Sequence, residues 1–419
     1  MTTLAAHLLT WVIIVIATAG VIARPFQLPE AIWAVTGAIL LVVLGLLPIS
    51  AAFSAVSKGN DVYLFLTGMM LLSETARREG LFDWVATFAV NSAKGSPRRL
   101  FLVVYGVGTV VTVFLSNDAT AVVLTPAVFA ATKKAKIEPL PFLFVCALIA
   151  NAASFVLPIS NPANLVLYGN HLPALAAWLA RFAAPSAAAI LATYLALRFV
   201  ERGSLRGICE CNLAQPPLSI GGWFALAGIG LTAVVLLTVS AFDVPLGLPT
   251  AIMGVLTALA VMALRCVSPW PVIKGVSWTV LPLVAGLFVL VEALGRTGIV
   301  AMLASALHTA ALSSDAATAE GVGDSVAVAS NLINNLPAGL IARSLVEAAH
   351  VSQRITDALL IGVDLGPNLS VTGSLATILW LSAIRREGED VTFCRFLKVG
   401  IGVMPPALLL ALGARLLIY

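Results

Sequence analysis

Residues Asn151 to Asn164 read NAASFVLPISNPAN, and residues Asp364 to Thr377 read DLGPNLSVTGSLAT. Both stretches interrupt long apolar runs with proline, amide and hydroxyl residues, and they align without a gap at an offset of 213 positions (364 − 151). Unwound backbone at membrane depth is tolerated only where protein or a water-filled cavity satisfies its polar groups. We therefore interpret both stretches as broken membrane helices in two halves of one design.

The composition supports a chain with many membrane spans. Of the 419 residues, 60% are hydrophobic and 11% are charged, and the mean hydropathy is +1.02. Soluble proteins carry about 25% charged residues. This excludes a cytosolic enzyme, a disordered chain and a nucleic-acid binder, and five cysteines are too few for a disulfide scaffold. The first apolar run lacks a cleavage site before Arg24, which favours a retained span over a signal peptide.

The first half, residues 1–200, is predicted to form the first of two repeats. Apolar runs predict spans near 5–23, 31–47, 62–75 and 174–200, a surface helix at 81–93 and a broken helix at 140–168. The run 100–132 is interrupted by Ser116-Asn117-Asp118 and lies between two clusters of Lys and Arg. Cytoplasmic loops collect such residues, so we expect a re-entrant hairpin with Asn117 and Asp118 at its tip.

The second half, residues 223–419, repeats this plan after a polar linker at 201–222. We expect spans near 223–242, 248–264, 277–294 and 399–417, a surface helix at 299–312 and an acidic loop at 313–323. A second hairpin is expected at 324–349 and a second broken helix at 357–384.

The predicted fold is an all-α polytopic membrane protein with two inverted-topology repeats. It has about ten transmembrane helices, two re-entrant hairpins and two broken helices. Five crossings per half require the second half to be inverted. This plan puts 18 of the 24 Lys and Arg residues on the cytoplasmic side together with the linker, and it places both termini outside the cytoplasm.

Inverted repeats with discontinuous helices are typical of secondary transporters, which bind their substrate between the repeats near the midplane. The hairpin tips and the broken helices offer amides and hydroxyls as candidate substrate ligands. These are Ser116, Asn117, Thr120, Asn151, Ser154, Asn161, Asn164, Asn331, Asn334, Asn335, Asn368, Ser370, Thr372 and Thr377. The set contains no Lys or Arg, which favours a neutral polyhydroxy solute or a small cation over a dianion. Capping of local backbone is the alternative role for each of them.

Asp118 and Asp364 are the most central ionisable residues. We expect them to couple transport to protons or ions, and the alternative is that each caps a half-helix. Glu74 and Glu292 are expected at the membrane interface. The pair Cys209 and Cys211 is interpreted as incidental, although two such thiols suit a soft metal or metalloid.

Four strings carry a resemblance to a known family. They are FLSNDATAVVLTPAV (114–128), NAASFVLPISNPANLV (151–166), SNLINNLPAG (330–339) and GPNLSVTGSLATILW (366–380). Together with the span plan, they resemble the ArsB arsenite and antimonite efflux permeases of the ion-transporter superfamily over essentially the whole chain. The Ser-Asn-Thr signature of the dicarboxylate transporters in that superfamily is absent, because Ser116-Asn117 is followed by Asp118.

The resemblance implies export of neutral As(OH)₃ or Sb(OH)₃ across the bacterial inner membrane in exchange for protons. It also implies a cytosolic ATPase subunit, ArsA, as a partner, and no cofactor. The chain shows no Walker motif, nucleophile–base pair or metal-ligand spacing, so we expect no enzyme activity of its own. A sodium/proton antiporter on the same fold is the first alternative, and an uncoupled channel is the second.

Overall fold

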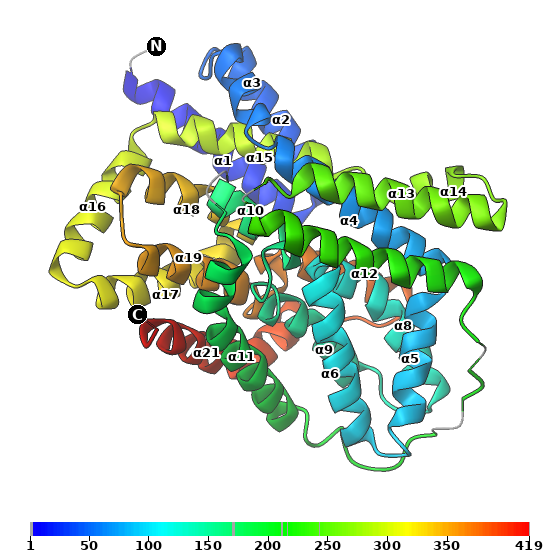
Figure 1. Cartoon of the computed structure of the whole chain (residues 1–419). Coiled ribbons are helices and arrows are strands. Elements are labelled where there is room, and N and C mark those ends of the chain that lie inside the picture. The colour runs from blue at the N-terminus through cyan, green and yellow to red at the C-terminus, as the bar shows by residue number, and fades with distance from the viewer. Residues whose placement is uncertain (1–2, 170–171, 211–212, 216, 243, 419) are drawn as a thin grey trace.

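The computed structural model describes residues 3–169, 172–210, 213–215, 217–242 and 244–418 (Figure 1). Every regular element within these ranges is a helix. The first half contains α1 (Thr3–Ala23), α2 (Glu30–Val43), α3 (Ile49–Ser57), α4 (Asn60–Arg78), α5 (Leu81–Ser92), α6 (Pro97–Phe114), α7 (Asn117–Ala119), α8 (Thr125–Lys134), α9 (Leu140–Ala152), α10 (Pro162–Tyr168) and α11 (Leu175–Val200).

The second half follows the same order. It contains α12 (Ile220–Ala241), α13 (Gly247–Arg265), α14 (Trp270–Gly275), α15 (Val280–Arg296), α16 (Ile299–Ser313), α17 (Asp315–Ile333), α18 (Asn335–Ala349), α19 (Gln353–Leu365), α20 (Leu375–Arg386) and α21 (Phe393–Leu416).

The two halves pack on each other reciprocally. Helix α4 lies along α13, and its equivalent α15 lies along α2 (Figure 1). Likewise α10 contacts α18, while its equivalent α20 contacts α8, and α11 packs against its own equivalent α21. A two-fold relation between the halves produces this exchange of partners. The all-helical polytopic fold with two repeats, predicted from the sequence, is confirmed.

Both predicted hairpins reverse direction at a polar tip. After α6, Ser116 has φ 146°, and the hydroxyls of Thr112 and Thr120 lie 2.8 Å apart across the turn. The chain then continues through α7 and a π-helical turn at Thr120–Leu124 into α8. The second tip turns at Asn334, where φ is 74°.

The second hairpin differs from its expected boundary. The sequence analysis expected an acidic loop at 313–323, but α17 is helical from Asp315. The side chain of Ser314 caps this helix by accepting a hydrogen bond from the Ala317 N–H. Asp315 in the first turn also suits the positive end of a helix dipole. The stretch from Asp315 onward is therefore a helix and not a loop.

The predicted broken helices are both present. The first consists of α9, a 3-10 turn at Pro158–Ser160 and α10. The second consists of α19, 3-10 turns at Gly366–Asn368 and Val371–Gly373, and α20. Proline cannot donate a backbone hydrogen bond, and it disfavours helical backbone in the residue before it. The prolines at 158, 162 and 367 therefore explain where the helices stop.

The expected ten crossings are not ten uninterrupted helices. Within the described residues, six helices are long and apolar enough to cross a membrane alone, namely Leu4–Ala23, Pro97–Phe114, Leu175–Val200, Ile220–Ala241, Gly247–Arg265 and Phe393–Leu416. Helices α15 and α16 qualify only as a pair bent by 74°. The shorter helices α2 and α9 are apolar, and the other expected spans are broken or carry charges. Several of the expected crossings are therefore built from two or more shorter helices.

The linker between the halves lies against the base of the first hairpin. The N–H of Cys209 donates to the Gly95 carbonyl, and the N–H of Glu210 donates to the Ala135 carbonyl. The Lys136 ammonium lies 2.6 Å from the Glu210 carboxylate. Cys211, the second member of the pair singled out in the sequence, lies outside the described residues.

Candidate functional site

Four half-helices begin around one small cavity, which we call the central pocket. Its lining includes the first residues of α7, α10, α18 and α20, which are Asn117, Pro162, Asn335 and Leu375. Its volume is about 10 Å³. The remaining lining consists of Leu66, Asp118, Asn161, Val280, Leu336 and Ala376. Both hairpin tips and both broken helices therefore meet at one point, as the sequence analysis expected.

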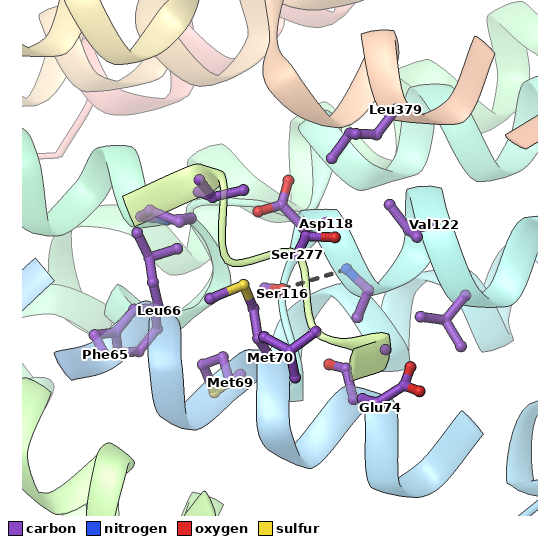
Figure 2. A pocket seen from close by; sticks show the side chains of 17 residues that line it. Phe65, Leu66, Met69, Met70, Glu74, Ser116, Asp118, Val122, Ser277 and Leu379 are labelled. Atoms are coloured by element: carbon purple, nitrogen blue, oxygen red, sulfur yellow. Dashed lines mark hydrogen bonds between the residues drawn. The ribbon is translucent and has the colours of Figure 1, made fainter. Parts of the chain in front are cut away.

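A second cavity of about 80 Å³, the access pocket, adjoins the central pocket (Figure 2). Leu66, Asp118, Pro162 and Val280 line both cavities. The access pocket extends along α4 past Met70 to Glu74, and Ser277 faces it from the opposite wall (Figure 2). Asp118 and Glu74 therefore line one cavity.

Asp364 is fully buried, with 0% exposure, behind the wall of the central pocket. The hydroxyl of Ser154 donates to its Oδ2 over 2.6 Å, and the amide of Asn161 donates to its Oδ1 over 2.8 Å. No Lys or Arg pairs with it within the described residues. A buried carboxylate held by neutral donors alone is a group whose charge is costly.

The same contact is made in the reverse direction by the other half. Asn151 occupies the position equivalent to Asp364 at the offset of 213, and Ser374 occupies that of Asn161. The Ser374 hydroxyl donates to Asn151 Oδ1 over 3.2 Å, just as Asn161 donates to Asp364. Asn161 caps α10 and Ser374 caps α20. Each broken helix therefore presents its cap residue to the other half.

Further hydrogen bonds hold the two breaks together. Asn151 donates to Asn368 Oδ1 over 3.0 Å, and Asn368 donates to the Leu148 carbonyl. Thr377 donates to the carbonyl of Val371 and completes a capping box with Ser374. In this conformation these side chains bind backbone and each other.

Asp118 differs from Asp364 in that its carboxylate forms no hydrogen bond or ion pair with any described residue. It is half-buried at the junction of the two pockets, where its carboxylate points into the cavity (Figure 2). Its backbone N–H donates to Asn117 Oδ1, and Ser116 accepts from the Ala119 N–H. Asp118 is therefore the carboxylate that lines both cavities.

The second tip is held by a dense set of local bonds. Asn331 Oδ1 accepts from both the N–H and the hydroxyl of Ser370, and the Thr372 hydroxyl donates to the Asn331 carbonyl. Asn334 donates to the Thr372 carbonyl over 3.3 Å. These residues lie together as expected, but they do not line either pocket.

Two amide oxygens near the centre lack a hydrogen-bond partner. They are Oδ1 of Asn335, which lines the central pocket, and Oδ1 of Asn164. The Asn164 amide group donates to three carbonyls at the first break, those of Ser154, Leu157 and Pro158. A buried acceptor without a partner is costly unless a ligand or a water molecule supplies the donor. Of the two oxygens, that of Asn335 is the one in the lining of the central pocket.

The described lining of both pockets contains two carboxylates, Asp118 and Glu74, and no Lys or Arg. The starts of helices present free N–H groups and partial positive charge, which offset these carboxylates. The Glu74 carboxylate is 7% exposed and binds Arg77 and Arg78 at 2.6 and 2.7 Å. Glu74 was expected at the membrane interface; it lies near the end of α4, with its carboxylate buried against these two arginines.

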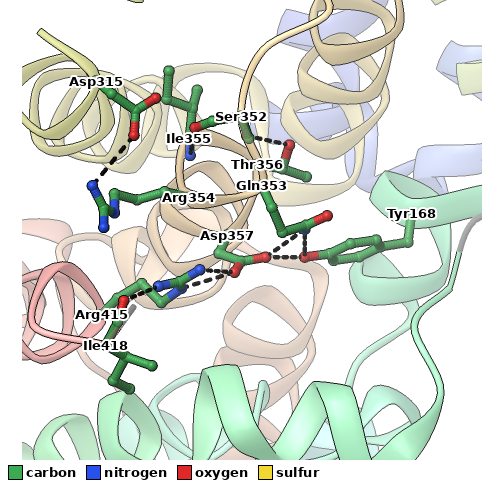
Figure 3. Close-up of polar contacts among 10 residues, drawn as sticks. All are labelled: Tyr168, Asp315, Ser352, Gln353, Arg354, Ile355, Thr356, Asp357, Arg415 and Ile418. Atoms are coloured by element: carbon green, nitrogen blue, oxygen red, sulfur yellow. Dashed lines mark hydrogen bonds and ion pairs between the residues drawn. The ribbon is translucent and has the colours of Figure 1, made fainter.

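A buried ion pair outside the pockets was not anticipated. Asp357 and Arg415 lie 2.7 Å apart, and Tyr168 and Gln353 donate to the second oxygen of Asp357 (Figure 3). The cluster ties α10 to α19 and α21. Its partners are far apart in sequence and none belongs to a recognisable motif, so the sequence offered no signal for it.

The chain matches the model of one protein family, described as CitMHS, citrate transporter, over residues 10–363. This chain belongs to the CitMHS family. It is an integral membrane protein. The repeats led us to expect a transporter, and the family is one of transporters.

Several relatives of this CitMHS member are named arsenical pump membrane proteins. One from Escherichia coli is 26% identical over 422 residues, covering 97% of this chain and 98% of the relative. One from Yersinia enterocolitica is 27% identical over 358 residues, covering 83% of each. The resemblance to ArsB-type permeases is thereby confirmed.

A solved structure shares the fold. It is the Alcanivorax borkumensis YdaH transporter, whose crystal structure is described as revealing an unusual topology. The TM-score is 0.53 at 15% identity, and the match covers 99% of this chain and 97% of that one. At this identity the likeness concerns the fold alone.

Proposed function

We propose that this CitMHS member exports trivalent arsenite or antimonite, as neutral As(OH)₃ or Sb(OH)₃, from the cytoplasm in exchange for protons. The relatives named arsenical pump membrane proteins support the choice of solute. The proposed setting is a bacterial inner membrane with both termini outside the cytoplasm. Association with an ArsA-type cytosolic ATPase remains a prediction.

One observation carries the choice of substrate: the central and access pockets have a largely apolar lining whose polar groups are amides, hydroxyls and two carboxylates, without a Lys or Arg. Citrate is a trianion near neutral pH, and planar carboxylates are normally recognised by arginine. A neutral trihydroxide needs only hydrogen-bond partners. The carboxylate of Asp118 and the free Oδ1 of Asn335 can accept from its hydroxyls.

Asp118 and Asp364 are proposed to couple the solute to protons. In the deprotonated state, Asp118 accepts hydrogen bonds from the solute. Protonation removes that acceptor and releases the solute on the other side. Asn161 lines the central pocket and also binds Asp364, so a change of charge at Asp364 alters the wall that faces the solute.

A sodium/proton antiporter is the alternative that one observation favours. Hard cations take oxygen ligands, and Asp118 and the free Oδ1 of Asn335 line the same central pocket. A sodium ion there would use the same oxygens as a hydroxylic solute. The two functions therefore share a site and differ in what the site carries.

The decisive experiment is arsenite uptake into everted membrane vesicles containing this protein, with and without a proton uncoupler. Uncoupler-sensitive uptake supports the proposal. Uptake that persists in the uncoupler indicates an uncoupled channel. Absence of uptake together with sodium-dependent proton movement transfers the protein to the antiporter alternative.

A further inference from the structure

Helices α4 and α15 are equivalent members of the two halves, and their ends carry the same residues. Before α4 stands Lys58-Gly59, and its end carries Glu74, Arg78 and then Gly80. The equivalent residues around α15 are Lys274-Gly275, Glu292, Arg296 and Gly298. Gly80 and Gly298 both have positive φ, 74° and 85°, and each precedes the next helix of its half. The correspondence therefore extends to backbone conformation.

The start of each helix meets the end of the other. The Lys58 ammonium lies 3.0 Å from the Glu292 carboxylate. At the opposite end, Gly275 lies against the carboxylate of Glu74 so closely that a Cβ there would collide with it. The two helices are thus antiparallel, as inverted repeats require. Lys58 stands two residues before α4, and Glu74 follows Lys58 by 16 residues, or about 24 Å at 1.5 Å per residue.

Each of these two junctions borders a cavity next to one hairpin. The Glu74 junction borders the access pocket, to which the first hairpin contributes Asp118. The Lys58–Glu292 junction borders another cavity, of about 150 Å³, which we call the charged pocket. The second hairpin contributes Arg343 and Glu347 to its lining. The access pocket and the charged pocket therefore lie at opposite ends of α4 and α15.

The two junctions are in different states. Glu292 binds Lys58 as well as Arg296. Glu74 instead binds Arg77 and Arg78, whereas the ammonium of Lys274 lies 5.4 Å from the ring centroid of Trp270. Lys274 forms no ion pair within the described residues.

We propose that the charged pocket is the second mouth of the permeation route, through which the solute of the central pocket passes, and that Lys58–Glu292 holds this mouth closed. Its ligand is the small neutral polyhydroxy solute, and in this respect the inference rests on the proposed function. In the opposite state Lys58 leaves Glu292 and Lys274 binds Glu74, so that the two junctions exchange roles. One turn of α18 separates Leu336, which lines the central pocket, from Leu340, which lines the charged pocket. That turn is the barrier to be opened.

Labelling of single cysteines tests this inference without any solute. In a chain whose native cysteines are replaced, the reporters are Ser73→Cys in the access pocket and Leu340→Cys in the charged pocket, which are 8% and 4% exposed. Lys58→Gln should raise the rate of maleimide labelling at position 340 and lower it at position 73. Loss of a partly exposed ion pair predicts changes of about 2- to 5-fold. Glu292→Gln gives the same comparison if Lys58→Gln fails to reach the membrane.

The double variant with Lys58→Glu and Glu292→Lys restores the pair with reversed charges and should return both rates toward the parent. Lys398→Gln, an exposed lysine without an ion pair on α21, is the control for loss of one positive charge. Equal labelling in Lys58→Gln and Lys398→Gln would overturn the inference. Because no solute enters this assay, its result is separate from that of the arsenite uptake experiment.

Discussion

The amide of Asn161 donates a 2.8 Å hydrogen bond to the carboxylate of Asp364, although 203 positions separate the two residues in sequence. Asn161 also caps α10 and lines the central pocket. The residue that caps one half-helix is thus hydrogen-bonded to the buried carboxylate of the other half. This link joins the solute to the group proposed to carry the proton.

Asp364→Asn should abolish uncoupler-sensitive arsenite uptake in everted vesicles, because the amide keeps the shape of the side chain but cannot exchange a proton near neutral pH. Asp324→Asn, a half-buried carboxylate on α17 outside both pockets, is the matched control. Retention of full uncoupler-sensitive uptake in Asp364→Asn would place the coupling elsewhere, with Asp118 as the next residue to test.

Asn161→Ala and Ser374→Ala remove equivalent caps but should differ in effect. Asn161→Ala removes a hydrogen bond to the carboxylate of Asp364, which contributes about 1.5–3 kcal/mol. Ser374→Ala removes a hydrogen bond to the neutral amide of Asn151, which contributes about 1 kcal/mol. We therefore expect the larger loss of uptake at a fixed amount of protein, and a changed dependence on pH, in Asn161→Ala. Equal behaviour of the two variants would contradict a special role for the Asn161–Asp364 bond.

Arg415→Met should destabilise the fold by about 3–5 kcal/mol, because it leaves Asp357 charged and buried at 0% exposure. Adding Asp357→Leu should recover much of this loss, since the uncompensated charge is then gone. The thermal unfolding of the two detergent-solubilised variants measures the difference. If the double variant is no more stable than Arg415→Met, the cost lies in packing instead of charge.

Replacement of all five cysteines should leave transport largely intact. Cys146 is the only cysteine in the described core of the first broken helix, and it lies outside the lining of both pockets. Recognition by hydrogen bonds needs no thiolate, and thiolate ligands would hold trivalent arsenic too tightly for release. Abolished uptake in a cysteine-free chain that reaches the membrane would overturn hydrogen-bonded recognition.

The tips and breaks were predictable because their causes are local. Proline alone does not decide a break, since Pro185 lies inside α11 and Pro405 and Pro406 lie inside α21. The breaks were recognisable because proline coincides there with amides and hydroxyls in an otherwise apolar run. The meeting of Asn117, Asn161 and Asn335 at one pocket followed from the repeat alone. The direction of each side chain did not follow: Asn164 turns back to the carbonyls of its own break, away from the central pocket.

Other features depend on pairs that no sequence pattern connects. The Asp357–Arg415 ion pair joins helices whose contact is fixed only by the packed fold. The burial of Glu74 depends on two neighbouring arginines and on Gly275, which arrives from the other half. A residue near the end of an apolar run can lie at the surface or inside, and only the partner helix decides between these places.

The reciprocal hydrogen bonds of Asn161 and Ser374 tie each broken helix to the other half. Each half supplies the donor for the acceptor of the other, so the covalent connection contributes proximity and not the fold itself. Two separately expressed polypeptides, divided between residue 213 and the start of α12, should therefore assemble by complementation into one transporter. Each polypeptide alone would insert with an unfinished interface and become a substrate for membrane proteolysis.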